Sequence, residues 1–331
     1  LSNANLSGVD LSGKDLTGTN LSSVDLSGKD LTGTILTGAN LSDSILPNIS
    51  LSDKNFQRTV FDGLDLSGKS LSKSSVWDAS FKNTNLENVN FMLADLRAVD
   101  LTKIKNNSLS GANLSRASFL LADLSHVNIS NIVLDGTNFL KTNLSGVDFT
   151  DLSSIPSGVI FKGSNLTNSN FEGTTLSPID LFKTNFENKA HLKQEFDSGA
   201  FGQRSFVQQL FGPGLDNIHI ISTDVNGNDL IVEYLYFNNF HGANLENANF
   251  KNASVWTVMF DTANLSNANF SGADLRSSSL QNTDLTNANL AGANLVGVDL
   301  SGSNLSGADL SGVIYNQNTI LKCINHTICV G

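Results

Sequence analysis

Large apolar residues recur at every fifth position along most of the chain. The series begins at Leu1 and Leu6 and continues without a slip to Leu101. The residue just before each large one is polar and usually Asn or Asp, and before that comes a small residue, as in Ala4-Asn5-Leu6. A period of five fits neither an α-helix nor a plain strand. The pattern therefore predicts a repeated unit, A-(N/D)-L-x-x, that forms neither element in its ordinary shape.

The repeat is interrupted at three places. Its register slips by three residues at 102–108 and slips again within 151–160, and a long stretch near the middle of the chain abandons the period altogether. We divide the chain accordingly into a repeat segment 1–186, a non-repeat insertion 187–239, a second repeat segment 240–315 and a C-terminal cap 316–331.

These in-register units resemble the pentapeptide-repeat family, and the resemblance covers all but the insertion and the tail. It implies an all-β fold: a right-handed quadrilateral parallel β-helix, or solenoid, with one unit on each side of a square coil, a small inserted α+β segment and a C-terminal cap. The physics agrees, because a turn at every fifth residue keeps strands short and lets the large and small apolar positions face one narrow interior.

Four units per coil place equivalent positions above one another. We expect apolar ladders at the strand spacing of ~4.8 Å between Phe61 and Phe81, Phe119 and Phe139, and Phe240 and Phe260. About 51 units would make about 13 coils and a rod roughly 60 Å long. Both ends of a stack expose apolar interior and unpaired backbone, so they need caps. The tail is the expected C-terminal cap, and missing sequence or a partner would cover the N-terminal coil.

Four units carry Lys where a small inward residue belongs: Lys14, Lys29, Lys54 and Lys69. A charge at an inward position is unfavourable unless it is paired or hydrogen-bonded. Each ammonium could reach backbone carbonyls or hydroxyls while its stem stays inside. The alternatives are a polar channel or anion site, or a local departure from the square coil.

The insertion has its own local patterns. "AHLKQEF" and "RSFVQQLF" predict short helices, and "NIHIIST" and "DLIVEYLYF" around "DVNGN" predict a β-hairpin with an Asn-Gly turn. So apolar a segment must pack against the repeats or dock on a partner. The aromatic residues that we consider for partner binding are Phe196, Phe201, Phe206, Phe211, Tyr234 and Tyr236.

Two weak metal patterns occur in the insertion. Asp224, Asn226, Asn228 and Glu233 resemble a calcium loop, but the glycine and the terminal acid are misplaced for an EF-hand, so a hairpin turn fits better. His191 and Glu195 could share a helix face, yet two groups without a third ligand make no site.

Both cysteines lie in the tail, as Cys323-x-x-His326-x-x-Cys329. A disulfide between them requires a compact loop, because six residues span ~9 Å in a helix and ~20 Å in a strand, beyond the ~7 Å limit. Such a bridge would resist fraying of the last coil and indicate an oxidising compartment. Free thiols, and a metal held by Cys323, His326 and Cys329 without a fourth ligand, remain alternatives.

Composition narrows the function. A net charge of −11 disfavours a nucleic-acid backbone as partner, and no apolar run is long enough to span a bilayer. The sequence contains no G-x-S-x-G elbow and no Gly-rich phosphate loop, so we expect no enzyme, no catalytic residue, no cofactor and no metal.

Two binding roles remain. Pentapeptide-repeat proteins linked to quinolone resistance resemble duplex DNA and bind type II topoisomerase (gyrase), which makes such modulation the alternative role here. However, −11 over roughly 60 Å is about one charge per 5 to 6 Å, against one per ~1.7 Å in DNA. We therefore favour a structural or interaction scaffold, extracellular or on the cell surface, that presents an acidic rod and the insertion to an unknown protein or cell-envelope partner. An unknown role in the cytoplasm is a further alternative.

Overall fold

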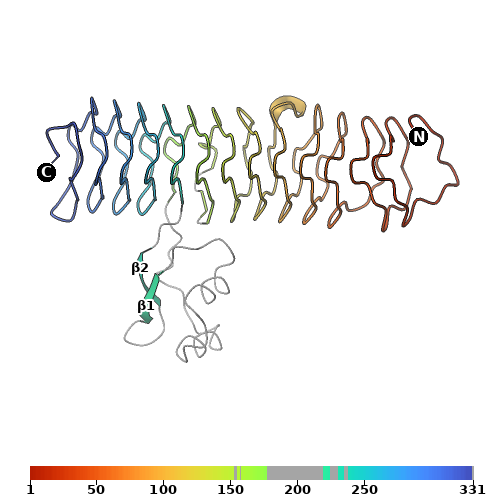
Figure 1. Ribbon diagram of the computed structural model, residues 1–331, viewed down its shortest axis with the longest axis horizontal. Coiled ribbons are helices and arrows are strands. Elements are labelled where there is room, and N and C mark those ends of the chain that lie inside the picture. The colour runs from red at the N-terminus through yellow and green to blue at the C-terminus, as the bar shows by residue number, and fades with distance from the viewer. Residues whose placement is uncertain (153–154, 157, 177–218, 224–229, 235–237, 330–331) are drawn as a thin grey trace. The chain divides into compact units, whose positions relative to one another are not determined.

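The computed structural model describes residues 1–152, 155–156, 158–176, 219–223, 230–234 and 238–329 of the chain. The chain forms two compact units. The first comprises Leu1–Leu152, Phe161–Phe171 and Ala243–Asn249, and the second comprises Ser153–Ile160, Glu172–Gly242 and Phe250–Gly331. In the described repeats of each unit the backbone winds through stacked coils, whose turns are visible in Figure 1.

Neighbouring coils are joined side by side through short parallel bridges. In the first unit Asp15 pairs with Ile35, which is one regular coil further along the chain. Across the 3-10 turn η1 (Lys105–Asn107) the paired residues lie further apart in sequence, because Asn90 pairs with Asn113. The predicted slip at 102–108 is therefore confirmed: its three additional residues are accommodated at one corner while the stacking on both sides continues.

The second unit keeps its coil across the insertion. Ile160 pairs with Asn239, and Asn239 pairs in turn with Met259. Within the insertion, β1 (His219–Thr223) and β2 (Leu230–Tyr234) form an antiparallel two-stranded sheet. Both strands lie within the two apolar runs of the predicted hairpin, and the Asn-Gly turn between them lies outside the described residues.

The repeated polar residues form the corners of the coil. At a typical corner the carbonyl oxygen of Leu66 accepts the N–H of Lys69 at 3.0 Å, and the third residue of the turn, Gly68, has φ 65°. A positive φ at this place defines a type II turn and explains the frequent Gly and Asn there. The preceding Asp65 accepts the N–H of Ser67 at 3.0 Å, so the Asn or Asp of each unit stabilises the start of its turn.

The large and small apolar positions of each unit fill the interior. Leu21 and Val24, for example, are both buried. Phenylalanines stack in ladders between coils. All three predicted pairs are confirmed, with ring centroids 5.2 Å apart for Phe61 and Phe81, 5.3 Å for Phe119 and Phe139, and 5.1 Å for Phe240 and Phe260.

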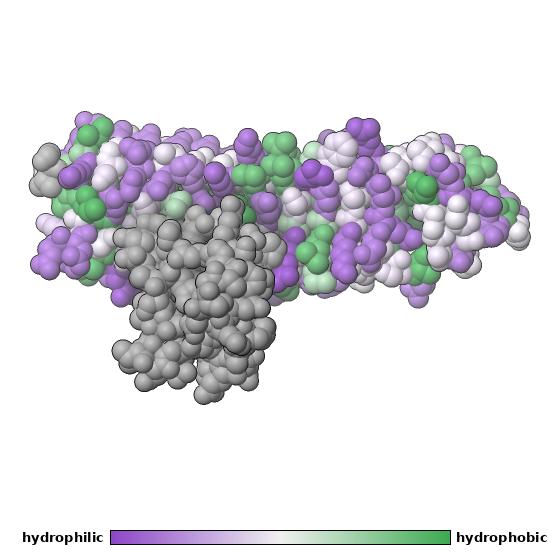
Figure 2. Space-filling view, turned by 60° about the horizontal axis from the view of Figure 1, so that its bottom comes forward, coloured by the Kyte–Doolittle hydropathy of each residue, from purple (hydrophilic) through white to green (hydrophobic). Residues whose placement is uncertain are grey.

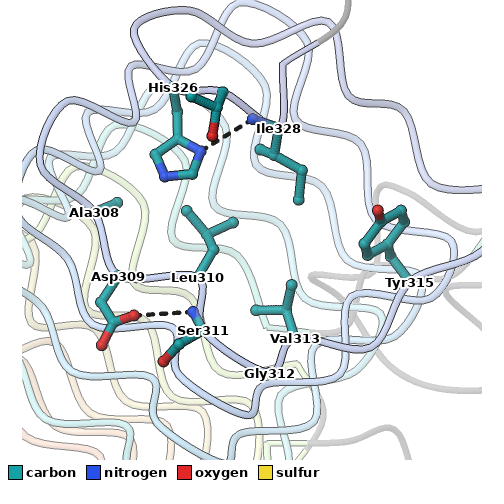
Figure 3. A pocket seen from close by; sticks show the side chains of 10 residues that line it. Ala308, Asp309, Leu310, Ser311, Gly312, Val313, Tyr315, His326 and Ile328 are labelled. Carbon is teal, nitrogen blue, oxygen red and sulfur yellow. Dashed lines mark hydrogen bonds between the residues drawn. The ribbon is translucent and has the colours of Figure 1, made fainter.

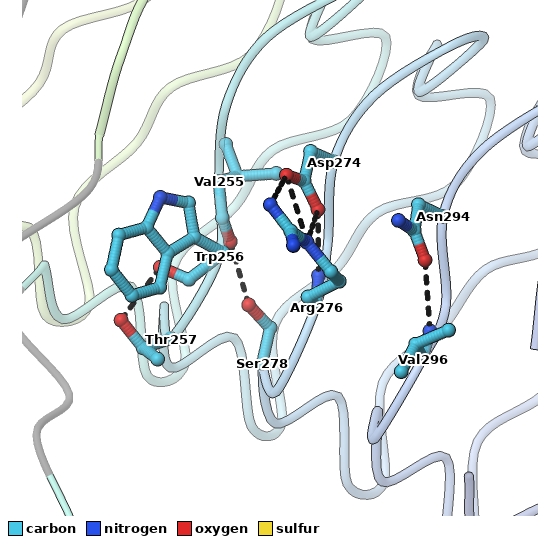
Figure 4. Close-up of polar contacts among 8 residues, drawn as sticks. All are labelled: Val255, Trp256, Thr257, Asp274, Arg276, Ser278, Asn294 and Val296. Carbon is cyan, nitrogen blue, oxygen red and sulfur yellow. Dashed lines mark hydrogen bonds and ion pairs between the residues drawn. The ribbon is translucent and has the colours of Figure 1, made fainter. Parts of the chain in front are cut away.

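Hydroxyl groups at small inward positions bond to the preceding coil. The Thr59 Oγ1 hydroxyl donates to the carbonyl oxygen of Leu36 at 2.7 Å. Ser278 Oγ donates in the same way to the carbonyl oxygen of Val255 at 2.6 Å (Figure 4). The carbonyl oxygen of Leu36 also accepts the N–H of Ala39 at 3.0 Å, and the Ser278 hydroxyl accepts the N–H of Val258 at 3.0 Å, so these buried polar groups are satisfied.

Candidate interaction surface

Two of the four predicted inward lysines donate to backbone carbonyls of the preceding coil, as the hydroxyls do. Lys54 Nζ donates to the carbonyl oxygen of Leu31 at 3.0 Å. Lys29 Nζ donates to the carbonyl oxygens of Leu6 and Val9, at 2.5 and 3.0 Å. Both side chains are half-buried, so the stem fills the interior and the ammonium bonds to backbone of the preceding coil.

The other two lysines differ in burial. Lys69 is half-buried, whereas Lys14 is exposed.

The tail closes into a compact loop through a disulfide between Cys323 and Cys329. Their Cα atoms lie 5.0 Å apart, well within reach of a disulfide. The tail also pairs with the last coils, because Ile320 and Ile324 accept the N–H groups of Leu300 and Leu305 at 2.9 and 3.0 Å. With both sulfurs bonded to each other, no thiolate is left for the metal set considered above. Among the described residues, no three His, Cys, Asp or Glu side chains are grouped to hold a metal ion.

An open cavity of about 510 Å³ lies beside this loop (Figure 3). Leu310, Val313, Tyr315, His326 and Ile328 contribute to its lining. The His326 imidazole accepts the N–H of Ile328 through Nδ1 at 3.2 Å, so this ring stabilises the turn of the tail. The lining is mixed in polarity, because Asp309 and Ser311 also contribute to it and the Asp309 carboxylate accepts the N–H of Ser311 at 2.9 Å.

The partner-binding prediction for the insertion falls largely outside the described residues. Phe196, Phe201, Phe206, Phe211 and Tyr236 lie there, as do the two predicted helices, and Tyr234 ends β2. What the structure does describe is the point of attachment. Asn238 Nδ2 donates to the carbonyl oxygen of Leu176 at 2.6 Å, so the described residues on either side of 177–237 are bonded to each other, with Asn238 itself among the last residues of the predicted insertion.

The outer surface of the repeats is mainly hydrophilic, with scattered apolar residues (Figure 2). Some outward positions carry large side chains. In the second unit Trp256 stands at a corner, and the neighbouring Arg276 forms a bidentate ion pair with Asp274, at 2.6 Å for the shortest contact (Figure 4). This ion pair satisfies both groups at the surface.

A more distinctive surface lies in the first unit. The Arg58 guanidinium sits 5.0 Å from the ring centroid of Trp77 and 3.5 Å from the carboxylate of Asp78. Further along the same corner, Leu121 is 63% exposed. Sequence reasoning missed this surface, although it has a signal: Trp and Leu stand in the two turn positions where Ser, Gly and Asn are usual.

The described helices do not reach the length and apolarity that a membrane span requires.

The profile of the family Pentapeptide repeats matches the chain in eight copies. They cover residues 1–38, 34–72, 78–105, 108–139, 122–151, 157–188, 239–277 and 278–314. The chain therefore belongs to the pentapeptide repeat family. Members of known structure form right-handed quadrilateral β-helices, and the predicted fold class is confirmed.

Several solved structures are similar to the chain. HetL of the cyanobacterium Nostoc sp. strain PCC 7120, a pentapeptide repeat protein involved in heterocyst differentiation regulation, is 20% identical. The match covers 96% of this chain and 92% of HetL, with a TM-score of 0.20. QnrB1, a plasmid-mediated fluoroquinolone resistance protein, is 17% identical over 78% of this chain and 92% of its own, with a TM-score of 0.28.

A third similar structure is Rfr23 of the cyanobacterium Cyanothece 51142, which is 23% identical over 51% of this chain and 92% of its own, with a TM-score of 0.18. A comparison with curated proteins finds no match. Identities and TM-scores this low leave the function to be argued from the chain itself.

Proposed function

We propose that this protein is a non-enzymatic interaction scaffold outside the cytoplasm, which presents its repeat surface and its insertion to a protein or cell-envelope component. The observation that carries the proposal is the hydrogen bond from Asn238 to Leu176. It allows the coil to continue past the insertion, so that the repeats act as a support and the insertion as the part displayed.

Two further features support the proposal. The described interior is filled mainly by apolar side chains and by hydroxyls such as those of Thr59 and Ser278, which bond to backbone, as suits a rigid support. The disulfide between Cys323 and Cys329 favours an oxidising compartment, since the cytoplasm keeps thiols reduced. Gyrase modulation is less well supported, because the net charge of −11 is spread much more thinly along the repeats than the charge of duplex DNA.

The experiment that tests this function replaces residues 177–237 by Ser-Gly. A regular unit places two residues between its large residue and the next small position, so Leu176-Ser-Gly-Asn238 restores the period of five. Glycine suits the positive φ of the third turn residue. This variant should keep the thermal midpoint of the repeats, which tests that the support is intact.

Partners captured by the intact chain and by the Ser-Gly variant are then compared by mass spectrometry. Loss of an identified extracytoplasmic partner on replacement supports the displayed-insertion role. An intact chain that captures no partner, or only cytoplasmic enzymes, would contradict the proposed function.

A further inference from the structure

One corner of the first unit carries a continuous column of large side chains. Successive residues are joined from coil to coil by backbone hydrogen bonds: Arg58 to Trp77, Asp78 to Arg97, Ala98 to Leu120, Leu121 to Leu140 and Lys141 to Lys162, at 2.9 to 3.4 Å. We name this column the basic–apolar ridge. Its large residues are Arg58, Trp77, Asp78, Arg97, Leu120, Leu121, Leu140, Lys141 and Lys162.

The charge of the ridge is opposite to that of the chain. The ridge holds four cationic side chains, whereas the whole chain has a net charge of −11. Arg58 contacts Asp78, and Arg97 forms a bidentate pair with Asp95 at 2.7 Å. The excess positive charge of the ridge therefore rests on Lys141 and Lys162.

Another corner of the same unit provides a comparison, because Asp43, Asp62, Lys82 and Lys103 follow one another there through equivalent bonds. That corner has balanced charge and no large apolar side chain, so the composition of the ridge is not a general consequence of the repeat.

Backbone conformation gives independent support. Leu121 has φ 62°, a left-handed conformation that disfavours branched, bulky side chains. It is also 63% exposed, so it gains little from burial within the chain. A glycine or asparagine would relieve the strain at this turn, as at Gly63 and Asn83. Strain without a packing benefit is a feature of binding sites, where a partner completes the burial.

The residue types are those that dominate binding energy in protein interfaces. Trp and Arg are the most enriched residues at interface centres, and Arg58 already stacks on Trp77 at 5.0 Å. A convex line of apolar groups between cations fits a groove that has an apolar floor and acidic walls.

The side chains on the neighbouring sides of the coil favour one of two possible partners of the ridge, a groove in a protein over a flat anionic membrane surface. Asp100 and Asp123 stand on one side of the ridge, at outward positions before a core residue, whereas Asp95 on the other side is paired with Arg97. A planar lipid headgroup layer would meet these carboxylates as well as the ridge, and the two would repel each other. A groove as narrow as the ridge would meet only the ridge.

We propose that the basic–apolar ridge of the first unit is a docking site for an acidic, apolar-floored groove of another protein. The inference rests on the proposed scaffold function and names a second contact surface for it, separate from the insertion. Failure of the ridge proposal can be distinguished from failure of the proposed scaffold function. The ridge variants below leave residues 177–237 unchanged, and they are assayed with a synthetic probe instead of captured partners.

The test uses the full chain and a fluorescent amphipathic peptide of Glu and Leu, with the same peptide carrying Lys for every Glu as a control. Lys141→Glu with Lys162→Glu should weaken binding of the acidic peptide at least 10-fold. The matched pair Lys82→Glu with Lys103→Glu makes the same charge change on the comparison corner and should weaken binding less than about 3-fold, since distant exposed charges are screened.

Apolar contact is tested by Leu121→Ser, which should weaken binding about 5-fold or more, as expected for losing part of a buried Leu. The control Ile35→Ser removes another exposed apolar residue, 46% exposed, away from the ridge, and should leave binding unchanged. Thermal midpoints of all variants verify folding.

Four outcomes would overturn the proposal: no saturable binding of the acidic peptide, equal binding of the Lys peptide, equal weakening by the two lysine pairs, or ridge-dependent binding to phosphatidylglycerol vesicles, which would assign the ridge to membranes.

Discussion

Asn238 and Leu176 are 62 residues apart in sequence, yet the side-chain amide of the first donates to the carbonyl oxygen of the second at 2.6 Å. At a regular corner this carbonyl would accept the N–H three residues on, as Leu66 does from Lys69. Asn238 supplies an equivalent donor and is fully buried. The side-chain amide of Asn238 thus replaces the backbone N–H donor of a regular turn where the repeat is interrupted.

Removing this donor should destabilise the second unit. Asn238→Ala leaves the carbonyl of Leu176 without its observed donor, which costs about 1–3 kcal/mol. The thermal midpoint of the variant should fall. In the Ser-Gly replacement of residues 177–237 a regular turn can form, so the same Asn238→Ala change should cost less there. Equal losses in the two backgrounds would contradict the role that we assign to Asn238.

The inward lysines predict a stabilising substitution. Thr34 and Thr59 bond to the preceding coil through hydroxyls, at 2.8 and 2.7 Å, where Lys54 uses its ammonium. Lys54→Thr should keep the bond with a shorter, neutral side chain and raise stability by about 0.5–1 kcal/mol, since a rotamer-rich charged side chain no longer needs to be ordered. Lys54→Val, which lacks the hydroxyl, is the control and should be less stable than Lys54→Thr in thermal unfolding.

The phenylalanine ladder of the second unit predicts a large cavity effect. Phe250 is buried and stacks on Phe270, with ring centroids 4.7 Å apart. Phe250→Ala should cost about 3–5 kcal/mol, and Phe250→Leu clearly less, because leucine refills most of the volume. Chemical denaturation monitored by circular dichroism measures both. Similar losses for the two variants would mean that ring stacking, rather than filled volume, dominates.

Stability should depend on pH in the acid range. The hydroxyl of Ser67, followed by its N–H, donates to the Asp65 carboxylate and lowers the pKa of Asp65 below its ordinary value of 3.8. Asp10, Asp15 and Asp25 have lowered pKa values through the same contacts. A folded-state pKa below the unfolded one stabilises the fold above the unfolded pKa, and this contribution is lost as pH falls through the folded pKa.

The thermal midpoint should therefore decrease as pH falls below about 4. Replacing Asp10, Asp15, Asp25 and Asp65 by Asn keeps a side-chain oxygen that accepts the turn N–H but does not titrate, so the slope of midpoint against pH should become smaller in this variant. An unchanged slope would show that other carboxylates control acid unfolding.

The disulfide should protect the C-terminal end locally. Replacing Cys323 and Cys329 by Ser opens the loop, and the chain-entropy model gives roughly 2 kcal/mol for a loop of this size. Hydrogen exchange should accelerate at the N–H groups of Leu300 and Leu305, which bond to the tail, and not at Leu280, which bonds to Asp299 one coil earlier. In addition, mass measurement after alkylation without reductant should find both cysteines unreactive, and two modified cysteines would contradict the bridge.

The sequence alone predicted the parts of the fold that depend on local spacing. The recurrence of a large apolar residue such as Leu66 at every fifth position predicted the core. Four units per coil predicted which phenylalanines stack. The Asn-Gly dipeptide predicted a hairpin whose strands are β1 and β2. The spacing of Cys323 and Cys329 limited them to a compact loop. The core and the stacking follow from the period, because each unit repeats the same turn and the same inward positions. The hairpin and the loop follow from local turn residues and from the spacing of the cysteines.

Only the tertiary structure decided which polar groups meet between coils. The acceptors of Lys54 and Thr59 lie 23 residues earlier in the chain, and the partner of Asn238 lies across the insertion. The ridge likewise requires Arg58, Trp77 and Leu121 to share one corner after the slip at η1. Such relations depend on how each interruption changes the stacking register, and a five-residue pattern read along the chain does not contain that information.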